Sequence, residues 1–167
     1  MARWVYCDAS ALIKRYAPET GTPLVNAAFN QTYPAHMTCT TLGVLETVSI
    51  LVRKRNDGRL SQAVCDQALI ELRAEIIDRV EFRVSPIDDE LAFDALDLIM
   101  RHNLNATDAL VLQSALDLQQ ALQAAGDEVV LWSADKRLVR AAQREGLATF
   151  DPEADALADF QQMFGAT

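Results

Sequence analysis

Short apolar segments alternate with longer amphipathic segments along nearly the whole chain. The apolar segments have the length of strands, and we expect strands at residues 3–7, 35–39, 80–84, 128–132 and 148–150. The segments between them are typical of helices. Strands that alternate with helices favour a parallel sheet that is covered by helices on both faces. We therefore expect an α/β fold, a three-layer sandwich with a central parallel sheet.

The helices and the turns between them indicate a single domain. We expect helical structure at about residues 9–30, 41–55, 60–78, 88–102, 105–124 and 135–145. Asn56-Asp57-Gly58 is a turn signal, and Gly146 is placed to end the last of these helices. The chain contains no internal repeat and no linker rich in Pro or Gly. One domain over residues 1–167 is therefore expected, and it is long enough to bury a core.

Composition excludes several classes of protein. The three cysteines lie far apart and form no C-x-x-C, so we expect neither a disulfide framework nor a zinc ribbon. No apolar segment approaches the length of a membrane span and no signal peptide is recognisable, so we expect a cytoplasmic protein. The formal net charge of −9 disfavours a protein that coats nucleic acid, because such binding depends on Lys and Arg. Acids grouped around a divalent cation would weaken that argument.

Asp8 and Asp135 occupy equivalent places in the predicted sheet. Each follows an apolar strand and stands where a helix begins. Ligands of parallel sheets bind outside the carboxyl ends of the strands, which is where these two acids should lie. Alternation along the strand predicts that the hydroxyl of Ser133 points to the same edge. The alternative for Asp8 is that it only caps the helix that follows it.

Glu46 and Asp108 lie on helices, on sides that are otherwise apolar. Glu46 is part of a helix that is apolar nearly all round, where an isolated carboxylate is costly. Asp108 precedes the buried stripe of its helix, whereas Asp117 lies roughly 180° around the same helix among polar residues. The alternatives are an ion pair of Glu46 with Arg53, two turns away, and stabilisation of Asp108 by the helix dipole.

Taken together, these four acids predict a metal site. Two follow parallel strands and two face inward from helices, so we expect all four at one end of the sheet. Four carboxylates held close together repel each other strongly unless a cation neutralises them. A donor set of oxygens, with neither His nor thiolate, favours Mg²⁺ or Mn²⁺ over zinc.

Four segments also carry a resemblance to a known family. In order along the chain they are "VYCDASALIKRY", "TTLGVLETVSIL", "NATDALVLQSAL" and "VVLWSADKRLVRAA". They resemble the four acidic motifs of PIN-domain nucleases, and in particular those of the VapC-type toxins of bacterial toxin–antitoxin pairs. A single segment such as "TDAL" is weak evidence, whereas the ordered set is specific. The resemblance extends from residue 5 to about residue 150.

The resemblance implies a PIN-like sheet with an acidic pocket at its carboxyl edge. It implies that the metal-binding and catalytic residues of this pocket are Asp8, Glu46, Asp108 and Asp135. The hydroxyls that would support them belong to Ser10, Thr107 and Ser133. The implied activity is endoribonucleolysis that depends on Mg²⁺ or Mn²⁺, with a cognate VapB-type antitoxin as partner and a homodimer as assembly. A helical insert at about residues 58–78 and an acidic tail at about 151–167 lie outside what compact members share.

Cations near the acidic motifs are candidates for binding RNA phosphates. Lys14 and Arg15 follow Asp8 in the sequence, and Lys136 and Arg137 follow Asp135. Further cations stand later in the same helices, namely Arg53, Lys54, Arg55, Arg140 and Arg144. The alternative is that these side chains form ordinary solvated helix faces.

Other functions fit parts of this pattern. A catalytically inactive nucleic-acid-binding module is disfavoured because all four acids are present. A PIN nuclease that processes RNA or cleaves DNA flaps, and is not a toxin, would carry the same residues. A phosphatase of the haloacid-dehalogenase type would need a second acid two residues after Asp8, where the chain has Ser10. A phospho-receiver domain would need an acid pair before Asp8, and residues 1–7 contain none.

Overall fold

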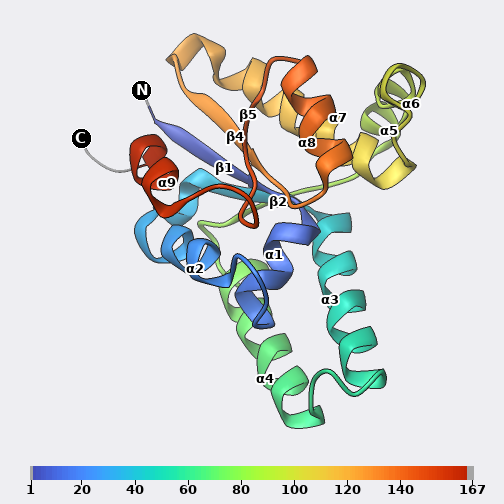
Figure 1. Cartoon of the computed structure of the whole chain (residues 1–167). Coiled ribbons are helices and arrows are strands. Elements are labelled where there is room, and N and C mark those ends of the chain that lie inside the picture. Colours follow the sequence, from blue (N-terminus) through green and yellow to red (C-terminus); the bar gives the residue numbers. More distant parts are fainter. Residues whose placement is uncertain (1, 165–167) are drawn as a thin grey trace.

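The computed structural model describes residues 2–164 and confirms the α/β fold (Figure 1). Within those residues, five parallel strands form one sheet in the order β3-β2-β1-β4-β5. The strands are β1 (Arg3–Cys7), β2 (Met37–Thr40), β3 (Arg83–Ser85), β4 (Glu128–Trp132) and β5 (Ala148–Phe150).

The central strand β1 marks the point where the strand order reverses. From β1 the chain proceeds outward to β2 and β3, and it then crosses to the other side of β1 to add β4 and β5. Ligands of such sheets bind at the carboxyl ends of the two strands that flank this point. Cys7 lies opposite Trp132 in the β1–β4 register, so Asp8 and Ser133 leave the sheet side by side.

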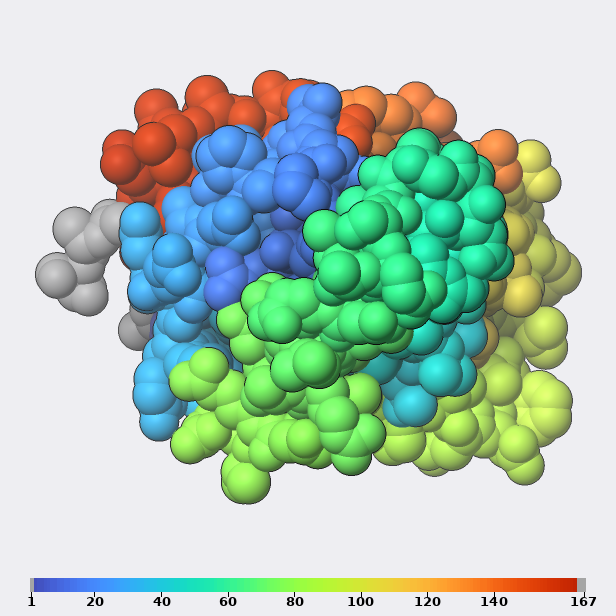
Figure 2. All heavy atoms as spheres, turned by 90° about the horizontal axis from the view of Figure 1, so that it is seen from below, coloured from blue at the N-terminus to red at the C-terminus, as the bar shows by residue number. Residues whose placement is uncertain are grey.

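One helical layer covers the face of the sheet to which Val5 and Cys7 point. It consists of α1 (Ala9–Tyr16), α2 (Thr22–Gln31), α3 (Thr41–Asn56), α4 (Gln62–Leu72) and α9 (Leu157–Phe164). Figure 1 shows α3 and α4 side by side, directed away from the sheet. In the view from below (Figure 2), α2 in blue and α3 and α4 in teal and green form this surface.

The second helical layer covers the opposite face, to which Tyr6 and Leu131 point. It consists of α5 (Asp89–Asp94), α6 (Leu96–His102), α7 (Ala106–Leu122) and α8 (Lys136–Arg144). The two faces bury separate apolar clusters because successive side chains of a strand point to opposite sides. Between residues 2 and 164, no helix is both long and apolar enough to cross a membrane.

Several predicted boundaries differ from the structure. The strand expected at 35–39 is Met37–Thr40, because a 3-10 turn occupies Pro34–His36, and the helix expected at 9–30 is divided into α1 and α2. The strand expected at 80–84 begins only at Arg83, because residues 79–82 form a turn that is closed by a hydrogen bond from Phe82 N to Arg79 O (3.2 Å). Val80 lies in this turn and is 96% exposed. The helix expected at 60–78 is α4 followed by a π-helical turn at Arg73–Ile77, in which Asp78 N donates to Arg73 O (2.8 Å).

The predicted acidic tail is largely a packed part of the domain. Its helix α9 buries Phe160 completely, and the ring lies 5.8 Å from that of Trp132 and 5.3 Å from that of Phe164, between ring centroids. The prediction of a tail rested on the acids of this segment, which occupy the turns before α9 and its exposed side. The last three residues of the predicted tail, 165–167, lie outside the described residues.

Candidate active site

Asp8 is fixed at the junction of β1 and α1. Its backbone N–H donates to the carbonyl of Trp132 (2.9 Å) and so extends the β1–β4 ladder by one residue. Its own carbonyl accepts the first helical bond of α1, from the N–H of Leu12 (2.9 Å). The side chain is only 5% exposed although it belongs to an acid. The backbone on both sides therefore holds this carboxylate at the carboxyl edge of the sheet.

The carboxylate of Asp8 is oriented by two serine hydroxyls. Its Oδ2 accepts hydrogen bonds from Ser10 Oγ (2.5 Å), Ser133 Oγ (3.0 Å) and Ser10 N (3.2 Å). The bond from Ser10 N caps α1, so the capping alternative describes part of what Asp8 does. All three bonds end on Oδ2, and no hydrogen bond within residues 2–164 reaches Oδ1.

The same hydroxyls join the two strand ends to each other. Ser10 Oγ accepts from the backbone N–H of Ala134 (2.9 Å), and Ser133 Oγ accepts from that of Asp135 (3.0 Å). Asp135 in turn caps α8, because its Oδ1 accepts from the N–H groups of Arg137 (2.7 Å) and Leu138. The loops after β1 and β4 are thus one hydrogen-bonded unit, which fixes Asp135 relative to Asp8.

Glu46 and Asp108 approach from helices of the two opposite layers. Asp108 lies in the first turn of α7, where Asn105 caps the helix and donates from Nδ2 to Asp108 Oδ2 (2.9 Å). Glu46 lies in the second turn of α3, and the nearby hydroxyl of Thr107 lowers the pKa of Glu46 against the effect of burial. Both carboxylates are partly buried.

All four predicted acids line a single cavity of about 370 Å³. Its lining is Asp8, Ala9, Ser10, Glu46, Ser49, Ile50, Arg53, Asp108 and Asp135. Within residues 2–164, however, no three His, Cys, Asp or Glu side chains are already close enough together to form a ligand set. Mutual repulsion is a sufficient physical reason, because charged carboxylates that share a cavity spread apart unless a cation lies between them.

Burial in the cavity disfavours the charged form of three of these acids, and neighbouring carboxylates add to this effect at Glu46 and Asp108. Burial raises the pKa of Asp108 to about 6, with further contributions from Asp135, Asp8 and Glu46. Burial also raises the pKa of Glu46, again with help from the charge of Asp8. The pKa of Asp8 itself is raised by burial, against the hydrogen bonds from its serine neighbours.

The raised pKa of Asp108 predicts how the stability of the metal-free protein changes with pH. Free Asp loses its proton near pH 4, so between about pH 4 and pH 6 the folded state binds more protons and becomes less stable as the pH rises. Asp108→Asn removes this penalty, and in EDTA the variant should have a higher Tm than the wild type at pH 7.5. The difference should shrink as the pH is lowered to 4. A difference that stays constant over this range would contradict the prediction.

Two of the side chains predicted to contact RNA, Lys14 and Arg15, form ion pairs within the protein. Lys14 is 2% exposed, and its Nζ pairs with Glu19 (2.9 Å) and Glu153 (2.5 Å). Arg15 pairs with Glu75 (Nη2 to Oε1, 2.6 Å) and lies beside α4, away from the acidic cavity. These ion pairs argue against the predicted contacts, and they join segments far apart in the sequence.

The other predicted contacts lie nearer the site. Lys136 pairs with Asp151, and Arg137 is exposed at the start of α8, where its charge acts on Asp108. The cavity lining also contains Ser49, which was not predicted, and Arg53, which the sequence offered only as one of several cations near the site. Both follow Glu46 on α3 by three and seven residues, and this spacing is the signal that could have identified them. No ion pair joins Glu46 to Arg53 within residues 2–164, contrary to the alternative considered above.

Several solved structures have a similar fold. PAE2754 from Pyrobaculum aerophilum is 18% identical with a TM-score of 0.59, covering 92% of this chain and 93% of its own. VapC20 from Mycobacterium tuberculosis, a sarcin–ricin loop cleaving toxin, is 15% identical with a TM-score of 0.58, covering 82% and 94%. FitAcB from Neisseria gonorrhoeae is 15% identical with a TM-score of 0.59, covering 90% and 99%. At such identities these structures support the fold alone.

The sequence itself decides the family. A search of curated proteins finds no match. The family described as PIN domain matches residues 5–144, which include all four acids of the cavity, the end of β1 that leads to Asp8, and the whole of β4. This match extends over most of the chain, and it agrees with the observed strand order and helical layers. The chain therefore belongs to the PIN-domain family.

Proposed function

We propose that this protein is a metal-dependent endoribonuclease and the toxin of a type II toxin–antitoxin pair. The observation that carries the proposal is the single cavity lined by Asp8, Glu46, Asp108 and Asp135 at the carboxyl edge of a PIN-domain sheet. PIN domains are nucleases, and an acid occupies each of the four motif positions in this chain.

The residues present fit a divalent cation. The four carboxylates offer only oxygen donors, which suits Mg²⁺ or Mn²⁺. Burial raises the pKa of Asp8, Glu46 and Asp108, and neighbouring carboxylates raise it further at Glu46 and Asp108, so a dication would stabilise the charged forms of these three acids. Asp8 and Asp108 would bind the metal directly, and Glu46 would complete the coordination shell directly or through a water. Asp135 would support the same ion, a second ion or the attacking water.

The chain's own residues orient the reaction. The hydrogen bonds from Ser10 and Ser133 hold Oδ2 of Asp8 in place. They therefore restrict rotation of this carboxylate and fix the direction of its other oxygen, Oδ1. When bound, the metal would lower the pKa of a water and stabilise charge on the phosphate oxygens. In hydrolysis the water oxygen bonds to phosphorus, a P–O bond to the next nucleotide breaks and the leaving oxygen gains a proton. Asp135, the exposed acid of the set, would accept the proton of the water.

The toxin assignment is supported by one of the similar folds, since VapC20 is a toxin that cleaves the sarcin–ricin loop. FitAB, solved bound to a DNA fragment, has a similar fold at 14% identity and a TM-score of 0.58. We propose a cognate VapB-type antitoxin as partner and a homodimer as assembly. Expression of the protein should arrest growth, and co-expression of the antitoxin should restore it. Cleavage without any effect on growth would favour the alternative, a PIN nuclease that processes RNA.

Metal removal gives the direct test of the chemistry. Purified protein should cleave labelled single-stranded RNA at internal positions with Mn²⁺ or Mg²⁺, and EDTA should abolish cleavage, because the carboxylates alone do not activate water. Mn²⁺ added in excess of the chelator should restore the activity. Cleavage that persists in EDTA would show that the acidic cavity is not the catalytic site.

A further inference from the structure

A second hollow, of about 510 Å³, adjoins the acidic cavity. The linings of the two hollows share Ser10, Ile50, Arg53 and Asp135, so they form one continuous depression. We call the second hollow the lateral groove. It extends from the carboxylates between α1 and α3 toward the loop that follows α3, and its outer wall contains Glu153 from the segment after β5.

The two hollows differ in charge. The acidic cavity has four carboxylates and, among its lining residues, the single cation Arg53. The lining of the lateral groove contains four cations against three acids. The cations are Lys14, Arg53, Lys54 and Arg59, and the acids are Glu19, Asp135 and Glu153. A strand of nucleic acid that leaves the acidic cavity would therefore pass from a lining dominated by acids to one in which cations outnumber acids by one, although the whole chain has a net charge of −9.

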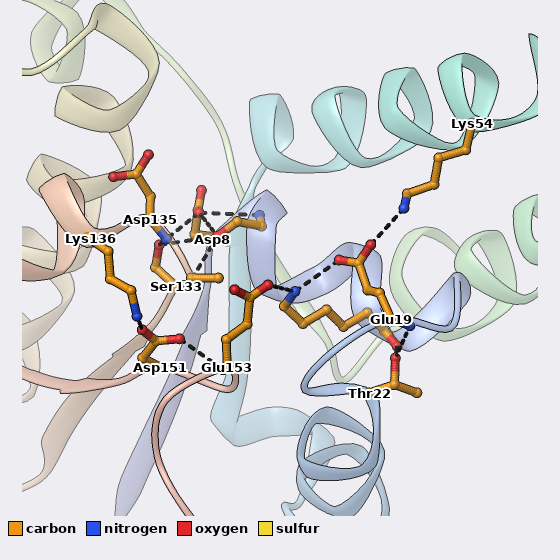
Figure 3. A network of polar contacts seen from close by, with 12 residues as sticks. Asp8, Glu19, Thr22, Lys54, Ser133, Asp135, Lys136, Asp151 and Glu153 are labelled. Carbon is orange, nitrogen blue, oxygen red and sulfur yellow. Dashed lines mark hydrogen bonds and ion pairs between the residues drawn. The ribbon is translucent and has the colours of Figure 1, made fainter. Parts of the chain in front are cut away.

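Most of these charges are already paired within the wall of the groove. Figure 3 shows Glu19 as the centre of a network, and its two carboxylate oxygens accept from Lys14 Nζ (2.9 Å) and Lys54 Nζ (2.7 Å). Lys14 also donates to Glu153. Lys14 is buried in this network, so its function here is to hold α1 against the segment after β5. The paired lysines and glutamates therefore form the wall of the groove. The two arginines of its lining, Arg53 and Arg59, are not part of this network and are the cations that could contact a ligand.

Arg53 is the arginine best placed to do so. Its side chain is exposed and makes no ion pair or hydrogen bond with any residue between 2 and 164. It lines both hollows, and its charge lowers the pKa of Glu46 against the effect of burial. Arg53 follows Glu46 by seven residues on α3, which is about 10 Å along the helix axis. It thus stands at the border between the acidic cavity and the lateral groove.

We propose that Arg53 binds the phosphate of the RNA strand next to the phosphate that is cleaved, and that Arg59 contacts the strand farther along the lateral groove. This proposal rests on the nuclease function proposed above. A planar guanidinium binds phosphate oxygens in pairs, and an exposed arginine without a partner has no internal bond to break first. Among the described residues Arg59 forms an ion pair with Asp57 alone, and an exposed ion pair of this kind is weak enough to exchange for a phosphate. Single strands commonly follow such positive grooves.

The test compares Arg53→Gln with the matched control Arg55→Gln. Arg55, on the same helix two residues later, is one of the cations that the sequence offered as RNA contacts, but it bonds to Asn56 and lines neither hollow, so we do not retain it as a contact. With labelled single-stranded RNA and Mn²⁺, Arg53→Gln should raise KM about tenfold and change kcat less than threefold. The slope of log KM against log salt should fall by about 0.7, the value for one phosphate contact with a single strand. Arg53→Lys should recover part of the loss, and Arg55→Gln should match the wild type.

Other outcomes separate this proposal from its alternatives. If Arg53 only adjusts the charge of Glu46, Arg53→Gln would lower kcat and shift its pH profile while KM stays the same, and the proposal would be overturned. Equal effects of the Arg53 and Arg55 substitutions would overturn it as well, since they would report general charge. If the wild type cleaves RNA and Arg53→Gln keeps the KM of the wild type, the phosphate site fails and the nuclease function stands. If the wild type neither binds nor cleaves RNA, both proposals fail.

Discussion

Asp8→Asn should reduce RNA cleavage by a factor on the order of 10³ while the fold remains intact. Loss of a residue that only supports a metal ligand typically costs 10- to 100-fold, so loss of a charged ligand should cost more. The amide that replaces the carboxylate has no negative charge, and one of its two terminal atoms is a hydrogen-bond donor that repels a cation. The measurement is the initial rate of cleavage of labelled RNA at saturating Mn²⁺.

The choice of Asn distinguishes the two explanations for Asp8. Asn is as good an N-cap as Asp, and its oxygen can still accept the bonds that Ser10 and Ser133 now donate to Oδ2. If capping were the only role of Asp8, the substitution would therefore leave both Tm and activity nearly unchanged. If Asp8 is a metal ligand, the activity falls and the Tm does not. Wild-type activity in Asp8→Asn would refute the assignment of the site.

Asp88→Asn provides a matched control for this experiment. Asp88 caps α5 and accepts from Leu91 N (2.9 Å), so the same chemical change is made at a cap of the same kind. Asp88 does not line the acidic cavity. Asp88→Asn should cleave RNA at the wild-type rate. A loss of activity equal to that of Asp8→Asn would indicate a general effect of charge on RNA cleavage.

The position of the candidate site could be predicted because strand ends obey a simple rule. Cys7 and Trp132 lie opposite each other in a parallel pair, and any acid that directly follows such strands comes to the same edge. Glu46 and Asp108 could be identified because a carboxylate on the apolar side of a helix conflicts with the local pattern. Both rules use only short-range information, which a single sequence contains.

The partners of the cations could not be predicted in the same way. Lys14 meets Glu153, which lies 139 residues later in the chain, and Arg15 meets Glu75, 60 residues later. In the sequence both cations look like the polar end of a short helix, and nothing nearby shows that they face inward. Only the packing of α1 against α4 and the segment after β5 decides which acids neutralise them.

The helix α9 was not predicted, because the acids of its segment indicated a polar tail. Leu157, Phe160 and Phe164 recur at the three- to four-residue spacing of an amphipathic helix, but the acids around them dominate the local charge. The segment also lies beyond residue 144, where the match to the family ends. The spacing of these apolar residues, and not the local charge, is the feature of the sequence that indicates the helix.

Phe160→Ala should lower the free energy of unfolding by about 3–5 kcal/mol, the usual cost of truncating a fully buried aromatic side chain. Phe160 is 0% exposed and packs edge-on against Trp132 of β4 and Phe150 of β5, with ring centroids 5.8 and 6.3 Å away. Its removal leaves a cavity beside the two strands that lead to Ser133 and Glu153. Urea unfolding followed by tryptophan fluorescence measures the change.

Phe93→Ala is the control for this substitution, because Phe93 on α5 is 68% exposed and should change the stability by no more than about 0.5 kcal/mol. The comparison decides whether α9 belongs to the core or merely lies against it. If both substitutions have the same small effect, α9 does not stabilise the sheet. If only Phe160→Ala destabilises the protein, the helix beyond the family match supports the strand β4 that leads to Asp135, and the stability of the candidate site depends on it.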